Sequence, residues 1–296
     1  MPEMIFAICT WNQPTHLQIC YDSLAASYGE LNEDNFYVIN NHSNYKSPGP
    51  SRVFHNHLRP DSSMGYLSRS WNQGLLWGFR NTTTPQTEWV VLVQSDVVFL
   101  PDWYAKFKEL TKDGNMPFIA CAPGDQVMFT HISAFREIGW WDERFCSNGY
   151  QEFDYFMRAY LRLGRRCMIQ GHGNQLIWNW PRGLDLITRT PATVEVGRPF
   201  GATQRLNPML QNHLMTKWGW DTAMRIYFDA ETLGDWTKYA DEAFGSPETP
   251  RSPEQMTKIP KEYNWYAYTY LDDPRDYSHL YYAYVPLKSE TLFTKG

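Results

Sequence analysis

Short apolar runs alternate with segments of helical periodicity over the first 170 residues, and this alternation constrains the fold more than any other feature. The run at 89–93 (WVVLV) is apolar throughout, as in a strand buried on both faces of a parallel sheet. Residues 15–26 instead place Leu17, Cys20 and Leu24 at helical spacing. The same criteria predict further strands at 5–9, 36–39, 52–55, 118–122 and 126–130, and further helices at 68–79, 101–110 and 153–163. The pattern predicts an α/β fold with a mostly parallel central sheet flanked by helices.

Polar residues follow several of the predicted strands. They are Asn12 after the first strand, Asn40 and Asn41 after the second, and Asp96 after the strand at 89–93. In open α/β sheets, ligands bind beyond the carboxyl ends of the strands. We therefore expect a ligand site at this edge of the sheet.

Asp96 is the only carboxylate among these strand-end residues. At the end of a buried strand, a carboxylate must be hydrogen-bonded, paired or metal-bound, because an isolated buried charge is too costly. A Mg²⁺ or Mn²⁺ ion that also binds substrate phosphates is one solution. Capping of the helix at 101–110 is the structural alternative, although Asp96 lies five residues before Pro101.

A second acidic group begins the helix predicted at 153–163. Glu152 and Asp154 lie in its first turn, with Arg158 one turn further along. The positive end of the helix dipole favours carboxylates there, which is a purely structural explanation. The functional alternative is a general base that removes the proton of a hydroxyl group.

The composition narrows the classes of protein to which the chain can belong. Aromatic residues make up 16% of the chain, which excludes an intrinsically disordered protein. The net charge of −5 argues against a broad nucleic-acid-binding or anionic-membrane face. The aromatic surplus, with only 20% charged residues, fits a protein that handles sugar rings and bases, and it fits an aromatic core equally well.

Three features bear on where the protein works. The first residues lack the basic region and the long apolar stretch of a signal peptide. No apolar run approaches the ~18 residues that a membrane span needs. The five cysteines form no CxxC pair, so reduced thiols are expected. We expect a cytoplasmic protein without a transmembrane segment.

Six segments, taken together and in order, resemble family 2 glycosyltransferases of the GT-A type, and most closely their rhamnosyltransferase-like branch. The segments are 8–12 (ICTWN), 38–43 (VINNHS), 65–74 (GYLSRSWNQG), 94–96 (QSD), 139–158 with its GWWDERF and QEFD motifs, and 212–219 (NHLMTKWG). The resemblance implies a nucleotide-sugar transferase domain over 1–220. The C-terminal extension at 221–296 has no counterpart in it, and consists of a proline-rich linker at about 245–260 and an aromatic tail at 261–296.

The resemblance also implies roles for single residues. The nucleotide-sugar would be held by Thr10, Asn12, Asn41, Arg69, Asn72, Ser95 and Asp96. Asp96 would bind Mn²⁺ or Mg²⁺ together with His172, with His213 as a weaker candidate for the second ligand. Glu152 would be the base of an inverting transfer, and Asp154 would bind the acceptor or support Glu152.

The sequence departs from the family pattern at three places, and these leave alternatives open. Gln94 stands where the family usually has Asp or Asn, and Asn40 stands where it commonly has Asp. Gln151-Glu152 replaces Glu-Asp. A retaining or metal-independent transferase and a non-catalytic nucleotide- or sugar-binding protein are the alternatives. The expected partners are a nucleotide-sugar donor, a saccharide, glycoprotein or lipid-linked acceptor rather than nucleic acid, and a second copy bound through the aromatic tail.

Overall fold

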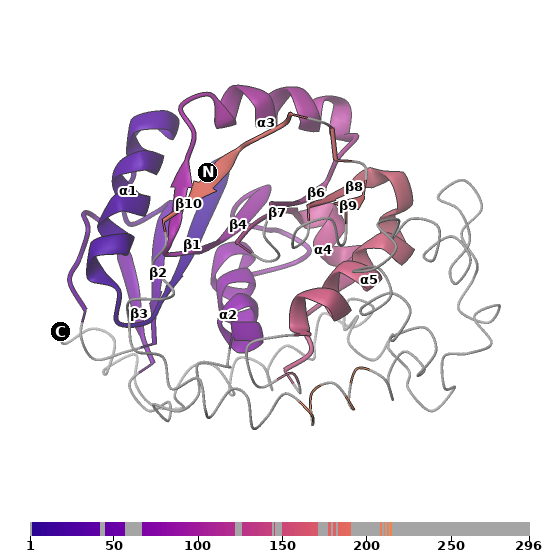
Figure 1. The fold of residues 1–296 in the computed structure, drawn as a ribbon, viewed down its shortest axis with the longest axis horizontal. Helices are drawn as coiled ribbons and strands as arrows, with labels where there is room; N and C mark the ends of the chain where they lie inside the picture. The colour runs from indigo at the N-terminus through magenta and orange to yellow at the C-terminus, as the bar shows by residue number, and fades with distance from the viewer. Residues whose placement is uncertain are drawn as a thin grey trace.

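The computed structural model describes residues 2–41, 45–56, 67–121, 126–143, 145, 150–170, 177–178, 180–181 and 183–190, together with residues 208, 210, 212 and 214. Within these residues, one sheet has the strand order β3-β2-β1-β4-β7-β6-β8-β9, and β10 pairs with β5 in a second, small sheet (Figure 1). The predicted extension at 221–296 lies outside the described residues, as do His172 and His213.

The bounds of the six predicted strands and four predicted helices agree closely with the structure, whereas β5, β8, β9, β10 and α4 were not predicted. The strands are β1 (Met4–Thr10), β2 (Phe36–Asn40), β3 (Arg52–His55), β4 (Trp89–Gln94), β5 (Val97–Phe99), β6 (Phe118–Cys121), β7 (Val127–His131), β8 (Cys167–Gln170), β9 (Ile177–Trp178) and β10 (Ile187–Arg189). The helices are α1 (Pro14–Tyr28), α2 (Leu67–Phe79), α3 (Trp103–Thr111), α4 (Ile132–Ile138) and α5 (Gln151–Leu163). Among the described residues, no helix has the length and apolar character that crossing a membrane requires.

The predicted fold class is confirmed, and the large sheet is mixed, with β7 and β9 antiparallel to their neighbours. β3, β2, β1 and β4 are parallel neighbours, and β6 is parallel to β8. β7, however, runs antiparallel to both β4 and β6. The reason is the short connection between β6 and β7, residues 122–126, because a parallel crossover needs a dozen residues or more.

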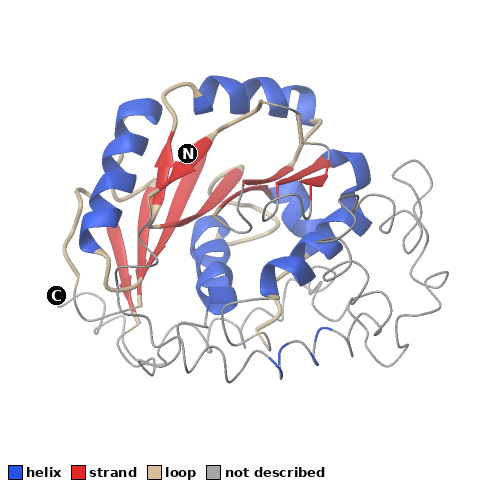
Figure 2. Ribbon diagram, in the orientation of Figure 1, coloured by secondary structure: helices blue, strands red, loops and turns tan. Residues whose placement is uncertain are grey.

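Helices cover both faces of the large sheet (Figures 1 and 2). Alternate residues of β1 belong to different cores: Phe6 packs in one cluster with residues of α1 and α3, whereas Ala7 packs in the other with residues of α2, α4 and α5. Burial on both faces explains why these strands are continuous apolar runs rather than alternating ones.

Two glycines let α2 lie very close to the sheet. A Cβ atom on Gly74 would lie 2.7 Å from Cδ2 of Leu92, and one on Gly78 would overlap the side chain of Val90. Gly78 therefore lies near the start of β4, at the amino edge of the sheet. The first turn of α2 consequently lies at the carboxyl edge, where the polar residues were predicted to gather.

Candidate active site

The carboxyl ends of β1, β2 and β4 meet in one place, as predicted. Thr10 pairs with Asn40 in the parallel register, and the backbone N–H of Asn41 donates to the carbonyl of Thr10 at 3.0 Å. On the other side of β1, the N–H of Ser95 donates to the carbonyl of Cys9 at 3.1 Å. The structure thus brings together predicted donor-binding residues from three separate segments.

A network of neutral amides covers this edge. Nδ2 of Asn41 donates to Sγ of Cys9 and to Oγ of Ser70, both at 3.1 Å. Nδ2 of Asn56 donates to Oδ1 of Asn41 and to Oε1 of Gln73, both at 2.9 Å. Sequence reasoning missed Asn56 and Gln73, whose only signal was their position just after β3 and inside the 65–74 motif. The network offers hydrogen-bonding groups without net charge.

The hydroxyl of Thr10 has no hydrogen-bond partner in the described part of the chain. The residue is only 3% exposed, and its Oγ1 atom is completely buried. Buried polar atoms of native proteins are nearly always hydrogen-bonded, so the Thr10 hydroxyl is an exception to this rule at the carboxyl edge of the sheet.

The turn from β1 into α1 brings a helix N-terminus to the same edge. Asn12 has a φ of 50°, a left-handed conformation that asparagine tolerates better than most residues. α1 begins at Pro14 without a side-chain cap, because Oε1 of Gln13 accepts a hydrogen bond from Oγ of Ser95 at 3.0 Å instead. The positive end of the helix dipole therefore faces this edge without a carboxylate in the first turn to offset it.

The carboxylate of Asp96 is paired with another side chain, which is one of the possibilities that its position at the end of a buried strand left open. Its carboxylate is 3% exposed and accepts a hydrogen bond from Nη2 of Arg189 at 2.9 Å. The N–H of Thr190 donates to the backbone carbonyl of Asp96, also at 2.9 Å. Arg189 reaches this place because β10 pairs antiparallel with β5, so that Arg189 lies opposite Val97. Sequence reasoning missed Arg189, which lies 93 residues away.

The predicted Mn²⁺ or Mg²⁺ site lies only partly within the residues that the structure describes. Within them, no group of three or more His, Cys, Asp or Glu side chains is placed to hold a metal ion. The one predicted ligand among them, Asp96, already neutralises its charge with Arg189. His172, the second predicted ligand, lies outside the described residues. No step of the mechanism below is therefore assigned to a metal.

The acidic pair of α5 divides into two different environments. Glu152 is partly exposed in the first turn of α5. Asp154 is completely buried, and its Oδ2 lies 3.0 Å from Nη2 of Arg158, which is buried as well. Nη1 of Arg158 also donates to the carbonyl of Ile138 at 2.9 Å. Of the two roles predicted for Asp154, support of Glu152 agrees with this burial.

The first turns of α2 connect the two halves of the site. Oγ of Ser70 accepts the hydrogen bond from Asn41 on the strand side, and Oγ of Ser68 donates to the carbonyl of Phe145 on the α5 side, at 3.3 Å. Between them, Nε of Arg69 lies 3.2 Å from a carboxylate oxygen of Glu143. The first turns of α2 thus contact both the strand ends and the segment that precedes α5.

Asn72 has a structural task in this connection. Its side chain is 1% exposed and is bonded to both backbone groups of Trp141, with Nδ2 to the carbonyl at 2.9 Å and Oδ1 from the N–H at 2.7 Å. Nδ2 also donates to Glu143 at 2.9 Å. The hydrogen bonds of Asn72 and the ion pair of Arg69 hold Trp141 and Glu143, in the segment before α5. The predicted contact of Asn72 and Arg69 with a donor stays a prediction.

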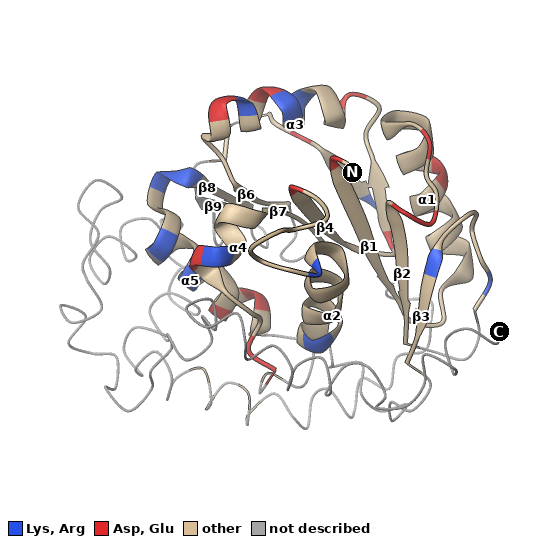
Figure 3. Cartoon of the chain, turned by 180° about the vertical axis from the view of Figure 1, so that it is seen from behind, with Lys and Arg blue, Asp and Glu red and all other residues tan. Residues whose placement is uncertain are grey.

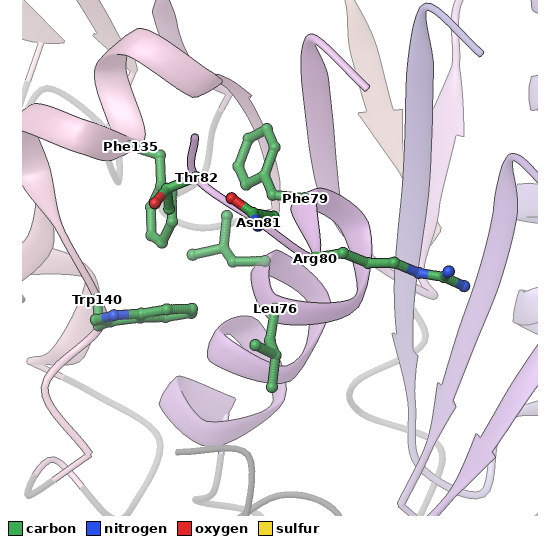
Figure 4. Close-up of a pocket in the computed structure, with 8 residues that line it drawn as sticks. Leu76, Phe79, Arg80, Asn81, Thr82, Phe135 and Trp140 are labelled. Atoms are coloured by element: carbon green, nitrogen blue, oxygen red, sulfur yellow. The ribbon is translucent and has the colours of Figure 1, made fainter. Parts of the chain in front are cut away.

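One hollow on the described surface lies away from this site. It is lined by Leu75, Leu76, Phe79, Arg80, Asn81, Thr82, Phe135 and Trp140 (Figure 4). These residues belong to the end of α2, the loop after it, and α4, which begins opposite the first residue of β4. The hollow is therefore at the amino edge of the sheet.

Charges of both signs are mixed on the outer helices (Figure 3). On α3, Nζ of Lys106 lies 2.9 Å from the carboxylate of Asp102, and Nζ of Lys108 lies 2.7 Å from that of Glu3. Such exposed pairs contribute little to stability. Arg189 differs from these surface cations, because it lies beside the candidate donor site.

Comparisons with known proteins return structures only. No family model matches the sequence, and no curated protein does. The crystal structure of S. aureus TarS 1-349 is 13% identical over 54% of this chain, with a TM-score of 0.38, and the match spans just over half (56%) of that chain. Glucosyl-3-phosphoglycerate synthase from Mycobacterium tuberculosis, solved with Mn²⁺, UDP and phosphoglyceric acid, is 12% identical over 72% of this chain and 77% of that chain, with a TM-score of 0.45. The mannosyltransferase PcManGT from Pyrobaculum calidifontis, solved with GDP-Man and Mn²⁺, is 11% identical over 81% of this chain and 85% of that chain, with a TM-score of 0.41. At these identities and TM-scores, the function has to be argued from the residues of this chain.

Proposed function

We propose that the protein is a glycosyltransferase that moves a sugar from a nucleotide-sugar donor to a hydroxyl group of a saccharide, glycoprotein or lipid-linked acceptor, with inversion at the anomeric carbon. One observation carries the proposal: the first turns of α2 contact both the polar carboxyl edge, where Asn41 donates to Ser70, and the segment before α5, where Ser68 donates to the carbonyl of Phe145. In the proposal, the carboxyl edge is the donor site and the acidic first turn of α5 supplies the base.

The donor half suits the nucleotide. Neutral amides and hydroxyls bind a base and a ribose through hydrogen bonds without the cost of burying a charge. The uncapped start of α1 offers backbone N–H groups to the diphosphate, because anions are stabilised at helix N-termini. In this proposal, the amide network around Asn41 and Asn56 selects the base of the nucleotide.

The acceptor half supplies the base. In the proposed reaction, the carboxylate of Glu152 takes the proton of the acceptor hydroxyl as its oxygen attacks the anomeric carbon. The bond from that carbon to the diphosphate oxygen breaks, and its electron pair leaves with the nucleoside diphosphate. The buried pair of Asp154 and Arg158 holds the first turns of α5, and therefore Glu152, in position.

Replacement of Glu152 tests the proposal directly. The full chain is incubated with UDP-, GDP- and dTDP-sugars and candidate acceptors, and released nucleoside diphosphate and the anomeric configuration of the product are measured. We expect Glu152→Gln to retain donor affinity and to lower the transfer rate at least ~100-fold, as loss of a general base does. Glu137→Gln, which alters an exposed carboxylate paired with Arg166, is the matched control.

Each alternative predicts a different result in this experiment. A retaining transferase gives a product with the configuration of the donor. A non-catalytic binding protein binds nucleotides but releases no diphosphate, and Glu152→Gln then changes nothing measurable. Near-normal turnover of Glu152→Gln with an inverted product moves the base to another residue.

The remaining parts of the proposal concern the chain beyond the described residues. We propose that the transferase domain spans 1–220 and that the aromatic tail at 261–296 contributes to the acceptor site or to contact with a second copy. We also propose that the protein acts in the cytoplasm, where nucleotide-sugar donors are available.

A further inference from the structure

Arg189 and Asp96 form an ion pair at the place where the donor's diphosphate is expected. Asp96 follows β4 at the carboxyl edge, next to Ser95, whose Oγ donates to Gln13 just before α1. The pair is therefore a neighbour of the uncapped α1 N-terminus. The side chain of Asp96 is 3% exposed to solvent, whereas the side chain of Arg189 is 30% exposed.

The guanidinium group of Arg189 is held in place, but not all of its N–H donors have hydrogen-bond partners among the described residues. Thr190 fixes the backbone next to it through hydrogen bonds from its N–H and its hydroxyl to the carbonyl of Asp96, at 2.9 and 3.2 Å. Nδ1 of His16 on α1 lies 2.9 Å from the same hydroxyl. An arginine has five N–H donors. Asp96 occupies one of those of Arg189, and the buried Nε of Arg189 has no hydrogen-bond partner among the described residues.

We propose that Arg189, oriented by Asp96, provides the positive charge that binds the diphosphate of the donor, so that donor binding does not require a divalent cation at Asp96. The inference rests on the function proposed above and specifies how its donor site works. A planar guanidinium binds phosphate oxygens through two parallel hydrogen bonds, which gives it both charge and geometry for this task. Asp96 then acts as a positioning residue rather than as a metal ligand.

The charges of the pair lead to opposite predictions for its two members. Arg189→Met removes the cation and leaves the buried carboxylate of Asp96, which repels a diphosphate unless a divalent cation neutralises it. Asp96→Asn removes the anion and leaves Arg189 positive. If Asp96 instead holds a metal ion, Asp96→Asn is the variant that loses donor binding.

The experiment measures the Kd of the full chain for UDP, GDP and dTDP by calorimetry, once in EDTA and once in Mn²⁺. For the nucleotide that binds, we expect the wild-type Kd to be the same in both. Arg189→Met is expected to weaken binding in EDTA by about tenfold to a hundredfold, the loss typical of charge-assisted hydrogen bonds, and to recover it in Mn²⁺. Asp96→Asn is expected to keep its affinity in EDTA, because the amide oxygen of asparagine can still accept the hydrogen bond that orients Arg189.

Controls separate a binding effect from a folding effect. Arg166→Met removes an arginine from an exposed pair with Glu137 and is expected to leave every Kd unchanged. Arg189→Lys keeps the charge without the planar fork, and it is expected to bind between wild type and Arg189→Met. Electron paramagnetic resonance of Mn²⁺ with the nucleotide gives a second readout: a signal of protein-bound Mn²⁺, distinct from that of the protein-free Mn²⁺–nucleotide complex, is expected for Arg189→Met and not for wild type.

Two results overturn the inference in different ways. Wild-type binding that needs Mn²⁺ and is lost in Asp96→Asn contradicts the role of Arg189 but leaves the transferase proposal standing. Absence of binding for all three nucleotides, with and without Mn²⁺, contradicts the proposed function and the role of Arg189 with it.

Discussion

Arg158 donates two hydrogen bonds to one carboxylate oxygen of Asp154, from Nε at 3.2 Å and from Nη2 at 3.0 Å, and both side chains are completely buried. The residues lie four apart, so both project from the same side of α5. Nη1 of Arg158 continues to the carbonyl of Ile138 at the end of α4. The pair therefore fastens the helix that carries Glu152 to its neighbour.

Breaking this pair from one side is expected to be costly. Arg158→Met leaves the Asp154 carboxylate buried without its partner, which typically costs about 3–5 kcal/mol of the free energy of unfolding. Chemical denaturation of the two proteins measures the difference. Arg166→Met, in the exposed pair with Glu137, is the control and is expected to cost less than about 1 kcal/mol. Equal effects of the two substitutions contradict a fastening role.

Thr10→Val separates ligand binding from stability. Because the Thr10 hydroxyl is buried without a partner in the described structure, its replacement by a methyl group is expected to leave the free energy of unfolding unchanged or to raise it. Nucleotide affinity is expected to fall by about fivefold to tenfold, the value of one hydrogen bond. Calorimetric titration and denaturation measure the two effects.

Thr130→Val is the matched control for that substitution. The Thr130 hydroxyl on β7 is also buried without a partner among the described residues, but Thr130 lies opposite Val90, near the amino edge of the sheet. Nucleotide affinity is expected to be unaffected there. If both substitutions weaken binding equally, the Thr10 hydroxyl has no special part in it.

Asn72→Leu is expected to loosen the segment before α5. The substitution leaves the buried N–H and carbonyl of Trp141 without their partner, at about 1–3 kcal/mol for each unsatisfied group. Denaturation measures this loss, and calorimetry of nucleotide binding gives the second readout, where only a small change is expected. A large loss of nucleotide affinity with unchanged stability would restore the predicted donor contact of Asn72.

His131 makes stability depend on pH. Burial lowers its pKa below the ordinary value, Arg136 lowers it further, and Glu88 partly opposes the shift. The neutral ring is therefore favoured in the folded state, where Nδ1 accepts the N–H of Ser133 at the start of α4. The stability contributed by this group is present above the unfolded-state pKa of about 6.5 and is lost as the pH falls through the folded-state pKa.

His131→Asn tests this pH dependence. Asparagine is a good helix cap that does not titrate, so we expect little change in stability at pH 7.5 and a weaker loss between pH 7 and pH 5 than in wild type. Thermal denaturation across this range measures both. An unchanged pH profile would show that His131 does not titrate on unfolding.

Much of the sheet was predictable, because buried strands are recognisable as apolar runs and their polar ends as a ligand edge. The direction of β7 was not predicted, because direction depends on connection length rather than on apolar pattern. The short strand β10 has no run of its own and forms by pairing with β5. Arg189 could not be placed beside Asp96 for that reason, although the need of a buried carboxylate for a partner was evident.

The most direct test of the central claim is a thermal-shift titration of the full chain with nucleoside diphosphates and nucleotide-sugars, in Mn²⁺ and in EDTA. A ligand at a hundred times its Kd adds about 2.7 kcal/mol of stability. We predict that one class of nucleotide raises the melting temperature of the wild type and raises it less in Thr10→Val. Equal melting temperatures with and without every nucleotide, under both conditions, would contradict a nucleotide-sugar site at the carboxyl edge of this sheet.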